Sequence, residues 1–80
     1  MDIDWRKHIH ADPKIMGGKP VVRGTRITVE LILEYIAEGA PESEILEAYD
    51  HLTEADIRAA VAFTHDILVK EAASARREAA

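Results

Sequence analysis

The segment Gly17–Thr28 constrains the fold most, because it places a glycine turn, two arginines and a helix start next to one another. Two short apolar pieces, Val21-Val22 and Ile27, flank the sequence Arg-Gly-Thr-Arg. Gly24 allows the positive φ that a tight hairpin requires. Thr28 is a suitable N-cap, since its hydroxyl can accept a backbone N–H of the first helical turn. The segment therefore predicts a β-hairpin that is fixed directly onto a following helix.

The length of 80 residues is that of one small domain, which buries only about 60% of its unfolded surface and gains stability from a partner. The chain has no cysteine, which excludes disulfides, zinc–thiolate sites and a cysteine nucleophile. No apolar run is long enough to span a membrane, and no signal-peptide pattern opens the chain. We expect a cytoplasmic protein.

The net charge of −5 is unevenly distributed. Residues 1–28 contain six basic and three acidic residues, whereas residues 29–80 contain four basic and twelve acidic residues. An acidic body repels nucleic acid, so any nucleic-acid contact is expected from the basic first third of the chain. The alternative is a solvated surface whose uneven charge has no function.

Apolar residues at helical spacing predict three helices after the hairpin, at 29–38, at 41–49 and from Thr53 onward. Ala40 is the expected N-cap of the second helix, and a poor one. In the third helix one face is expected to be buried, formed by Ile57, Ala60, Val61, Thr64, Ile67 and Leu68. The prediction is a mainly α, three-helix helix-turn-helix-like domain, of winged-helix or homeodomain-like type, with a short N-terminal β-hairpin. Its parts are an arm at 1–16, the domain at 17–68, and a helical or disordered tail at 69–80.

The arm contains the single tryptophan, Trp5, which we interpret as a packing anchor. His8, His10 and Asp12 alternate along an extended segment, but this spacing is unspecific for a metal and no second set of ligands follows. Most carboxylates fall on the outer stripes of helices and do not converge, so neither a metal, a cofactor nor an enzymatic activity is predicted.

DNA binding is the chemical function that the basic residues favour. Lys19, Arg23 and Arg26 on the hairpin are candidate phosphate contacts, and Arg58 on the third helix is a candidate base contact. So few charges give only modest, salt-sensitive affinity, so a homodimer would be needed. In the alternative, Arg23 and Arg26 pair with Glu30 or Glu34 and hold the hairpin in place.

Several motifs of the chain resemble a widespread prokaryotic family. They are Trp5-Arg6-Lys7, Ile9-His10, Asp12-Pro13, Gly17-Gly18-Lys19-Pro20, Arg23-Gly24-Thr25-Arg26-Ile27, Glu44-Ile45-Leu46, His51-Leu52-Thr53 and Asp56-Ile57. The chain is similar over residues 4–68 to domain-of-unknown-function family four hundred and thirty-three. The resemblance implies a compact helix-turn-helix domain, commonly encoded beside a small nuclease of PIN type.

The resemblance thus implies the antitoxin of a type II toxin–antitoxin pair, which neutralises a PIN-like ribonuclease toxin by contact and also binds promoter DNA. Lys70, Arg76 and Arg77 on the tail are candidates for contact with the toxin. Two alternatives stay open: a free-standing DNA-binding regulator, and a homo-oligomeric structural domain without a ligand.

Overall fold

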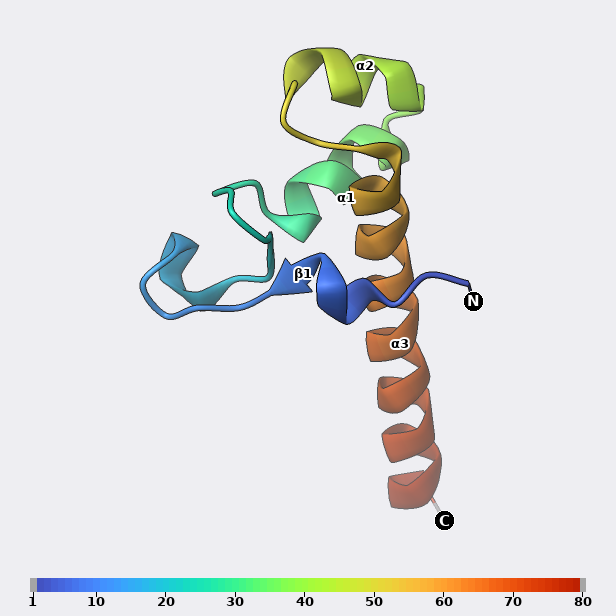
Figure 1. Cartoon of the computed structure of the whole chain (residues 1–80). Coiled ribbons are helices and arrows are strands. Elements are labelled where there is room, and N and C mark those ends of the chain that lie inside the picture. Colours follow the sequence, from blue (N-terminus) through green and yellow to red (C-terminus); the bar gives the residue numbers. More distant parts are fainter. Residues whose placement is uncertain (1, 80) are drawn as a thin grey trace.

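The structure, a computed structural model, describes residues 2–79, which form three α-helices and one two-stranded antiparallel sheet (Figure 1). The strands are β1 (Ile9–His10) and β2 (Val21–Val22), and the helices are α1 (Val29–Ala37), α2 (Glu42–Ala48) and α3 (Glu54–Ala79). Short 3₁₀ turns lie at Trp5–Lys7 and Met16–Gly18. This is the mainly α, helix-turn-helix-like fold that the sequence predicts. Met1 of the arm and Ala80 of the tail lie outside the described residues.

The sheet joins β2 to the N-terminal arm. Ile9 lies opposite Val22, and His10 lies opposite Val21. The predicted tight turn is also present, because the Val22 amide donates to the Ile27 carbonyl at 3.0 Å and Val21 forms a single bridge with Thr28. Strand β2 therefore lies between the arm and the start of α1. The sequence predicts the turn but not the pairing with β1, since a two-residue strand has no detectable periodicity.

Helix α1 begins and ends as its caps predict. The Thr28 hydroxyl accepts a hydrogen bond from the Leu31 amide at 3.2 Å. At the other end Gly39 has a φ of 85°, the left-handed conformation in which helices commonly end. The helix ends one residue before the predicted limit at Glu38.

Helix α2 begins one residue later than the sequence predicts, and its N-cap is Pro41 rather than Ala40. No side-chain hydrogen bond caps this end of the helix. Glu42 and Glu44 in the first turn place negative charge beside the positive end of the helix dipole, which partly compensates for the missing cap. As predicted, α2 begins without a good N-cap, although the capping residue is Pro41 and not Ala40.

Helix α3 begins with the predicted capping box. The Thr53 hydroxyl accepts from the Asp56 amide at 3.1 Å, and the Asp56 carboxylate accepts from the Thr53 amide at 3.0 Å. The helix then continues without a break through 26 residues, a length of about 39 Å. Residues 69–79 of the predicted tail are therefore helical.

The buried face of α3 differs from the predicted one. Ile57 and Ala60 are buried as expected, but Val61, Ile67 and Leu68 are 45%, 41% and 63% exposed. The smaller residues Ala59 and Ala62 are buried instead. The first half of α3 contacts both the arm and α1, and alanine side chains allow both neighbours to approach its backbone closely. Val61, Ile67 and Leu68 consequently lie outside this buried contact.

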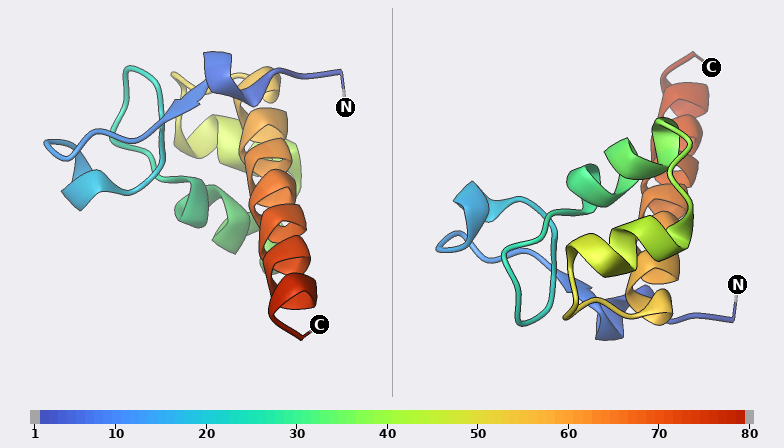
Figure 2. Two further views of the ribbon diagram at one scale, coloured as in Figure 1. Left: turned by 90° about the horizontal axis from the view of Figure 1, so that it is seen from below. Right: turned by 90° about the horizontal axis from the view of Figure 1, so that it is seen from above.

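The core lies where the arm, α1, α2 and the first half of α3 meet. Its buried residues include Ile9, Val22, Ile32, Ile45 and Leu52. An edge-to-face contact between Tyr35 and Tyr49, with ring centroids 6.1 Å apart, further joins α1 to the end of α2. Seen from below and from above, the second half of α3 extends beyond this core (Figure 2).

The capping box predicts a specific loss of stability. We expect Thr53→Ala to lower the free energy of unfolding by about 1 kcal/mol, because α3 loses the acceptor for one of its first amides. Ser43→Ala is the control, since Ser43 is exposed on α2 and this change removes a helix hydroxyl that makes no capping hydrogen bond. Urea denaturation measures both variants, and equal stability of the two would contradict the role of Thr53.

Candidate functional site

The N-terminal arm is fixed to α3 through Trp5. The indole Nε1 donates to the Asp66 carboxylate at 2.7 Å, and the ring meets Phe63 edge-to-face with centroids 4.8 Å apart. The Arg6 guanidinium lies over the Trp5 ring, 4.5 Å from the ring centroid. Trp5 is therefore a packing anchor, as the sequence predicts.

The same contact changes the ionisation of Asp66. The hydrogen bond from Trp5, followed by the one with His65, holds the pKa of the Asp66 carboxyl below its ordinary value of 3.8. Because the folded-state pKa is the lower one, the carboxylate contributes its full stabilisation above the unfolded-state value. That contribution is lost as the pH falls through the folded-state pKa.

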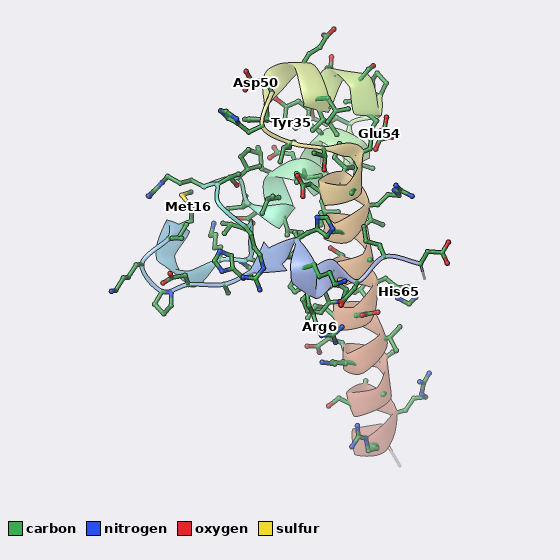
Figure 3. All side chains as sticks on the ribbon, viewed as in Figure 1. Arg6, Met16, Tyr35, Asp50, Glu54 and His65 are labelled. Atoms are coloured by element: carbon green, nitrogen blue, oxygen red, sulfur yellow. The ribbon has the colours of Figure 1, made fainter. Side chains whose placement is uncertain are left out.

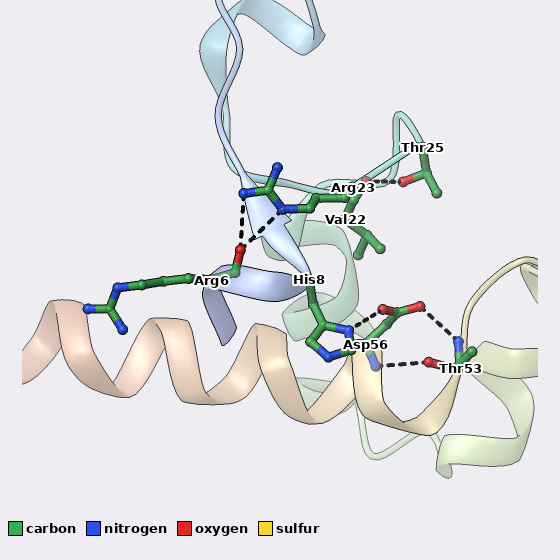
Figure 4. A network of polar contacts seen from close by, with 7 residues as sticks. All are labelled: Arg6, His8, Val22, Arg23, Thr25, Thr53 and Asp56. Atoms are coloured by element: carbon green, nitrogen blue, oxygen red, sulfur yellow. Dashed lines mark hydrogen bonds and ion pairs between the residues drawn. The ribbon is translucent and has the colours of Figure 1, made fainter. Parts of the chain in front are cut away.

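His8 belongs to a polar network that reaches the start of α3 (Figure 4). Its Nδ1 lies 2.9 Å from Oδ1 of Asp56, whose other oxygen accepts from the Thr53 amide. Both side chains are partly buried. Within residues 2–79 no group of three or more histidine and acidic side chains converges in a way that would hold a metal ion. The arrangement of His8 is that of a structural contact.

Arg23 points back toward the arm rather than outward from the turn (Figure 4). Its Nε and one terminal nitrogen donate to the Arg6 carbonyl at 3.1 and 3.0 Å. The alternative that Arg23 pairs with Glu30 or Glu34 is wrong, because among the described residues Arg23 donates to the Arg6 carbonyl and forms no ion pair with either glutamate; Glu30 pairs with Lys19. For Arg26 no ion pair is found within residues 2–79.

The four candidate DNA contacts lie at three separate places. Arg23 and Arg26 line one shallow depression at the turn, together with His51. Lys19 lies at the edge of an apolar groove between α1 and α3. Arg58 lies on α3, where it borders Asp4 of the arm on one side and Ile36 of α1 on the other. The geometry therefore groups only the two arginines of the turn.

The apolar groove between α1 and α3 was not predicted. It is lined by Pro20, Val29, Leu33, Phe63 and Ile67. The ion pair between Lys19 and Glu30 lies at its edge. The helical spacing of apolar residues predicts a buried face on each helix. It does not reveal that α1 and α3 diverge where α3 extends beyond the core, which leaves a groove between their apolar faces.

The three candidate toxin contacts lie on the second half of α3, which has no other element beside it (Figure 1). Lys70, Arg76 and Arg77 are all exposed. Leu68 and Val69 precede them and are 63% and 51% exposed, which is unusual for two adjacent large apolar residues. Within residues 2–79 no helix has both the length and the apolar character needed to cross a membrane.

Fold and surface together define a small helix-turn-helix-like domain with an N-terminal strand and a protruding last helix. The profile of a family described as "protein of unknown function (DUF433)" matches residues 9–64, and the chain belongs to this family. This is the family that the sequence motifs resemble.

Two relatives extend the comparison. The uncharacterised protein y4eO of Sinorhizobium fredii is 40% identical over 55 residues, which cover 69% of this chain and 25% of that protein. The crystal structure of a DUF433 member from Anabaena variabilis superimposes with a TM-score of 0.69 at 36% identity, covering 72% of this chain and 57% of that one. The chain thus spans a quarter of the first relative and just over half of the second.

The contact between Trp5 and Asp66 predicts a change in titration. We expect Trp5→Phe, which keeps an aromatic ring against Phe63, to raise the pKa of Asp66 toward 3.8 because the carboxylate loses its strongest donor. A carbon-detected NMR titration measures this value. Arg6→Ala is the control, since Arg6 is the weakest of the contributions to the shift and its loss is expected to change the pKa less. The assignment fails if Asp66 titrates alike in the wild type and Trp5→Phe.

The two arginines of the turn are expected to differ in their effect on stability. Arg23→Ala removes both hydrogen bonds to the Arg6 carbonyl, so we expect a loss of about 1 kcal/mol. Arg26→Ala removes no intramolecular hydrogen bond of the described residues and is expected to stay within about 0.5 kcal/mol of the wild type. Thermal unfolding of both variants measures the difference. Equal losses would exclude a structural role specific to Arg23.

Proposed function

We propose that this protein is the antitoxin of a type II toxin–antitoxin pair, which binds a PIN-like ribonuclease in the cytoplasm and blocks it by contact, without catalysing a reaction. The observation that carries the proposal is the second half of α3, which extends beyond the core with basic and apolar side chains exposed. A helix of this kind is a common means by which one small protein reaches into a groove of another.

The charges on this helix fit such a partner. A PIN-type nuclease holds its metal in a cluster of carboxylates, and the basic side chains of Lys70, Arg76 and Arg77 are complementary to that cluster. The ring of positive charge with which a nuclease attracts RNA is in turn complementary to the acidic body. Between Arg26 and Arg58 the chain contains no lysine or arginine, whereas it contains nine carboxylates. The charges of the tail and of the body are therefore each complementary to a surface of such a nuclease.

Membership of the family adds a second line of support. The resemblance implies that members are commonly encoded beside a PIN-type protein, and an antitoxin is encoded beside its toxin. Promoter binding by Arg26 and its neighbours at the turn remains compatible with this role.

The test is co-expression of this chain with the product of its neighbouring gene, followed by affinity purification and a ribonuclease assay. We expect a stable complex whose ribonuclease activity returns when this chain is removed. The double variant Lys70→Glu/Arg77→Glu is expected to weaken the complex at least about tenfold, because both charges are reversed at the contact. Lys14→Glu is the control, since Lys14 is an exposed lysine of the loop between the strands.

Two outcomes would overturn the proposal. A complex that the double variant and the control weaken equally would exclude the second half of α3 as the contact. Absence of any complex, together with binding of upstream DNA that weakens in Arg26→Ala, would favour the alternative of a DNA-binding regulator, for which the helix-turn-helix layout speaks.

A further inference from the structure

The side of α3 that faces solvent has the spacing of a coiled-coil seam. Val61, His65, Leu68, Ala72 and Ala75 follow one another at alternating intervals of four and three residues. Val61 and Leu68, one heptad apart, are 45% and 63% exposed. We refer to these five residues as the seam, with Val61, Leu68 and Ala75 at heptad position d and His65 and Ala72 at position a.

The chain itself does not cover the seam. The residues that hold the arm, Phe63 and Asp66, lie at outer heptad positions f and b, on the opposite side of α3. His65 lies on the side of α3 away from the loops of the sheet, below the first residues of the arm (Figure 3), and its Nδ1 is 3.2 Å from Oδ1 of Asp66. At the upper end of the seam Val61 lies beside Ile36 of α1 in a shallow depression, and Ile36 is itself 40% exposed. The apolar surface therefore runs from the body onto the protruding half of the helix.

Two charges beside the seam indicate what covers it. Glu71 is at position g and Arg76 at position e, and neither has an opposite charge three or four residues away in its own helix. Neither takes part in an ion pair within residues 2–79. In a parallel two-stranded coiled coil, position g of one helix faces position e five residues further along the other. Glu71 would thus face Arg76 of a second copy, and the symmetry supplies this pair twice.

The opposite orientation is disfavoured by the same charges. In an antiparallel pair, g positions face g positions and e positions face e positions, which brings glutamate beside glutamate and arginine beside arginine. The polar His65 at a core position adds a second constraint, since a single polar residue at position a specifies register at some cost in stability.

We infer that two copies of this chain associate through the seam as a parallel, in-register pair of α3 helices. Lys70 and Arg77 both fall at position f, on the outside of such a pair. The dimer therefore leaves Lys70 and Arg77 free for the proposed contact with the toxin, whereas Arg76 would contribute to that contact only in a chain that is not paired. Because the association concerns this chain alone, it is tested without any partner.

The first test is sedimentation of the full chain over a range of concentrations. We expect a reversible dimer in the wild type and a monomer in Leu68→Asp, which places a charge in the seam. Ser74→Asp is the matched control, because Ser74 is exposed at outer position c of the same helix, and it is expected to dimerise as the wild type does. A wild type that remains monomeric throughout, or equal loss in both variants, would overturn the inference.

Charge exchange tests the pairing. Glu71→Arg and Arg76→Glu each bring like charges together and are expected to weaken the dimer, whereas the double variant restores the pair and the dimer. A double variant that is as weak as the single ones would exclude the contact between Glu71 and Arg76.

The orientation is tested by disulfide formation, for which the chain is suited because it has no cysteine of its own. Ala75→Cys at position d is expected to form a disulfide-linked dimer readily under mild oxidation, whereas Ser74→Cys at position c is not. Equal crosslinking of the two would overturn the seam. Crosslinking of Leu68→Cys without that of Ala75→Cys would overturn the parallel orientation.

Discussion

The Asp56 carboxylate is the group on which the arrangement of the whole domain depends, because its two oxygens serve distant parts of the chain. One oxygen accepts from the Thr53 amide and fixes the start of α3, and the other lies 2.9 Å from Nδ1 of His8. Strand β1 follows His8 directly and pairs with β2, which leads through the turn into α1. Together with the contact between Trp5 and Asp66, this acidic side chain sets the position of the first strand relative to the last helix. Since both side chains are partly buried, loss of either leaves the other without its partner in a partly desolvated place.

The sequence predicts those parts of the fold that depend on neighbouring residues. The Thr28 cap, the end of α1 at Gly39 and the capping box of Thr53 and Asp56 each involve residues no more than four positions apart, so their residue types suffice. The contacts that hold the arm are different. Trp5 and Asp66 are separated by 61 positions and His8 and Asp56 by 48. The periodicity of a single sequence carries no information on which distant residues come into contact. The sequence therefore identifies Trp5 as an anchor without revealing what it contacts.

The errors on α3 and at the turn have one physical origin. Helical spacing shows which residues share a face, but the face that is buried depends on which neighbours approach and how closely. Here the arm and α1 approach across alanines, and the larger Val61 and Leu68 remain outside. Likewise the composition of the turn reveals two arginines but not that the Arg6 carbonyl lies within reach of one of them. The candidate site could thus be assembled from the sequence as a set of charges, whereas its geometry required the positions of the neighbouring segments.

The continuity of α3 has a consequence for the cost of recognition. An isolated helix of fewer than about 12–15 residues is marginal in water, because forming its first turn is unfavourable. The protruding half of α3 avoids that step, since it grows from a half that the core already holds in helical form. Its side chains are therefore presented on a backbone that is ordered before any encounter, and a protein that binds them does not have to supply the free energy of ordering. The core of the domain thereby acts as the nucleus for a helical segment that lies outside it.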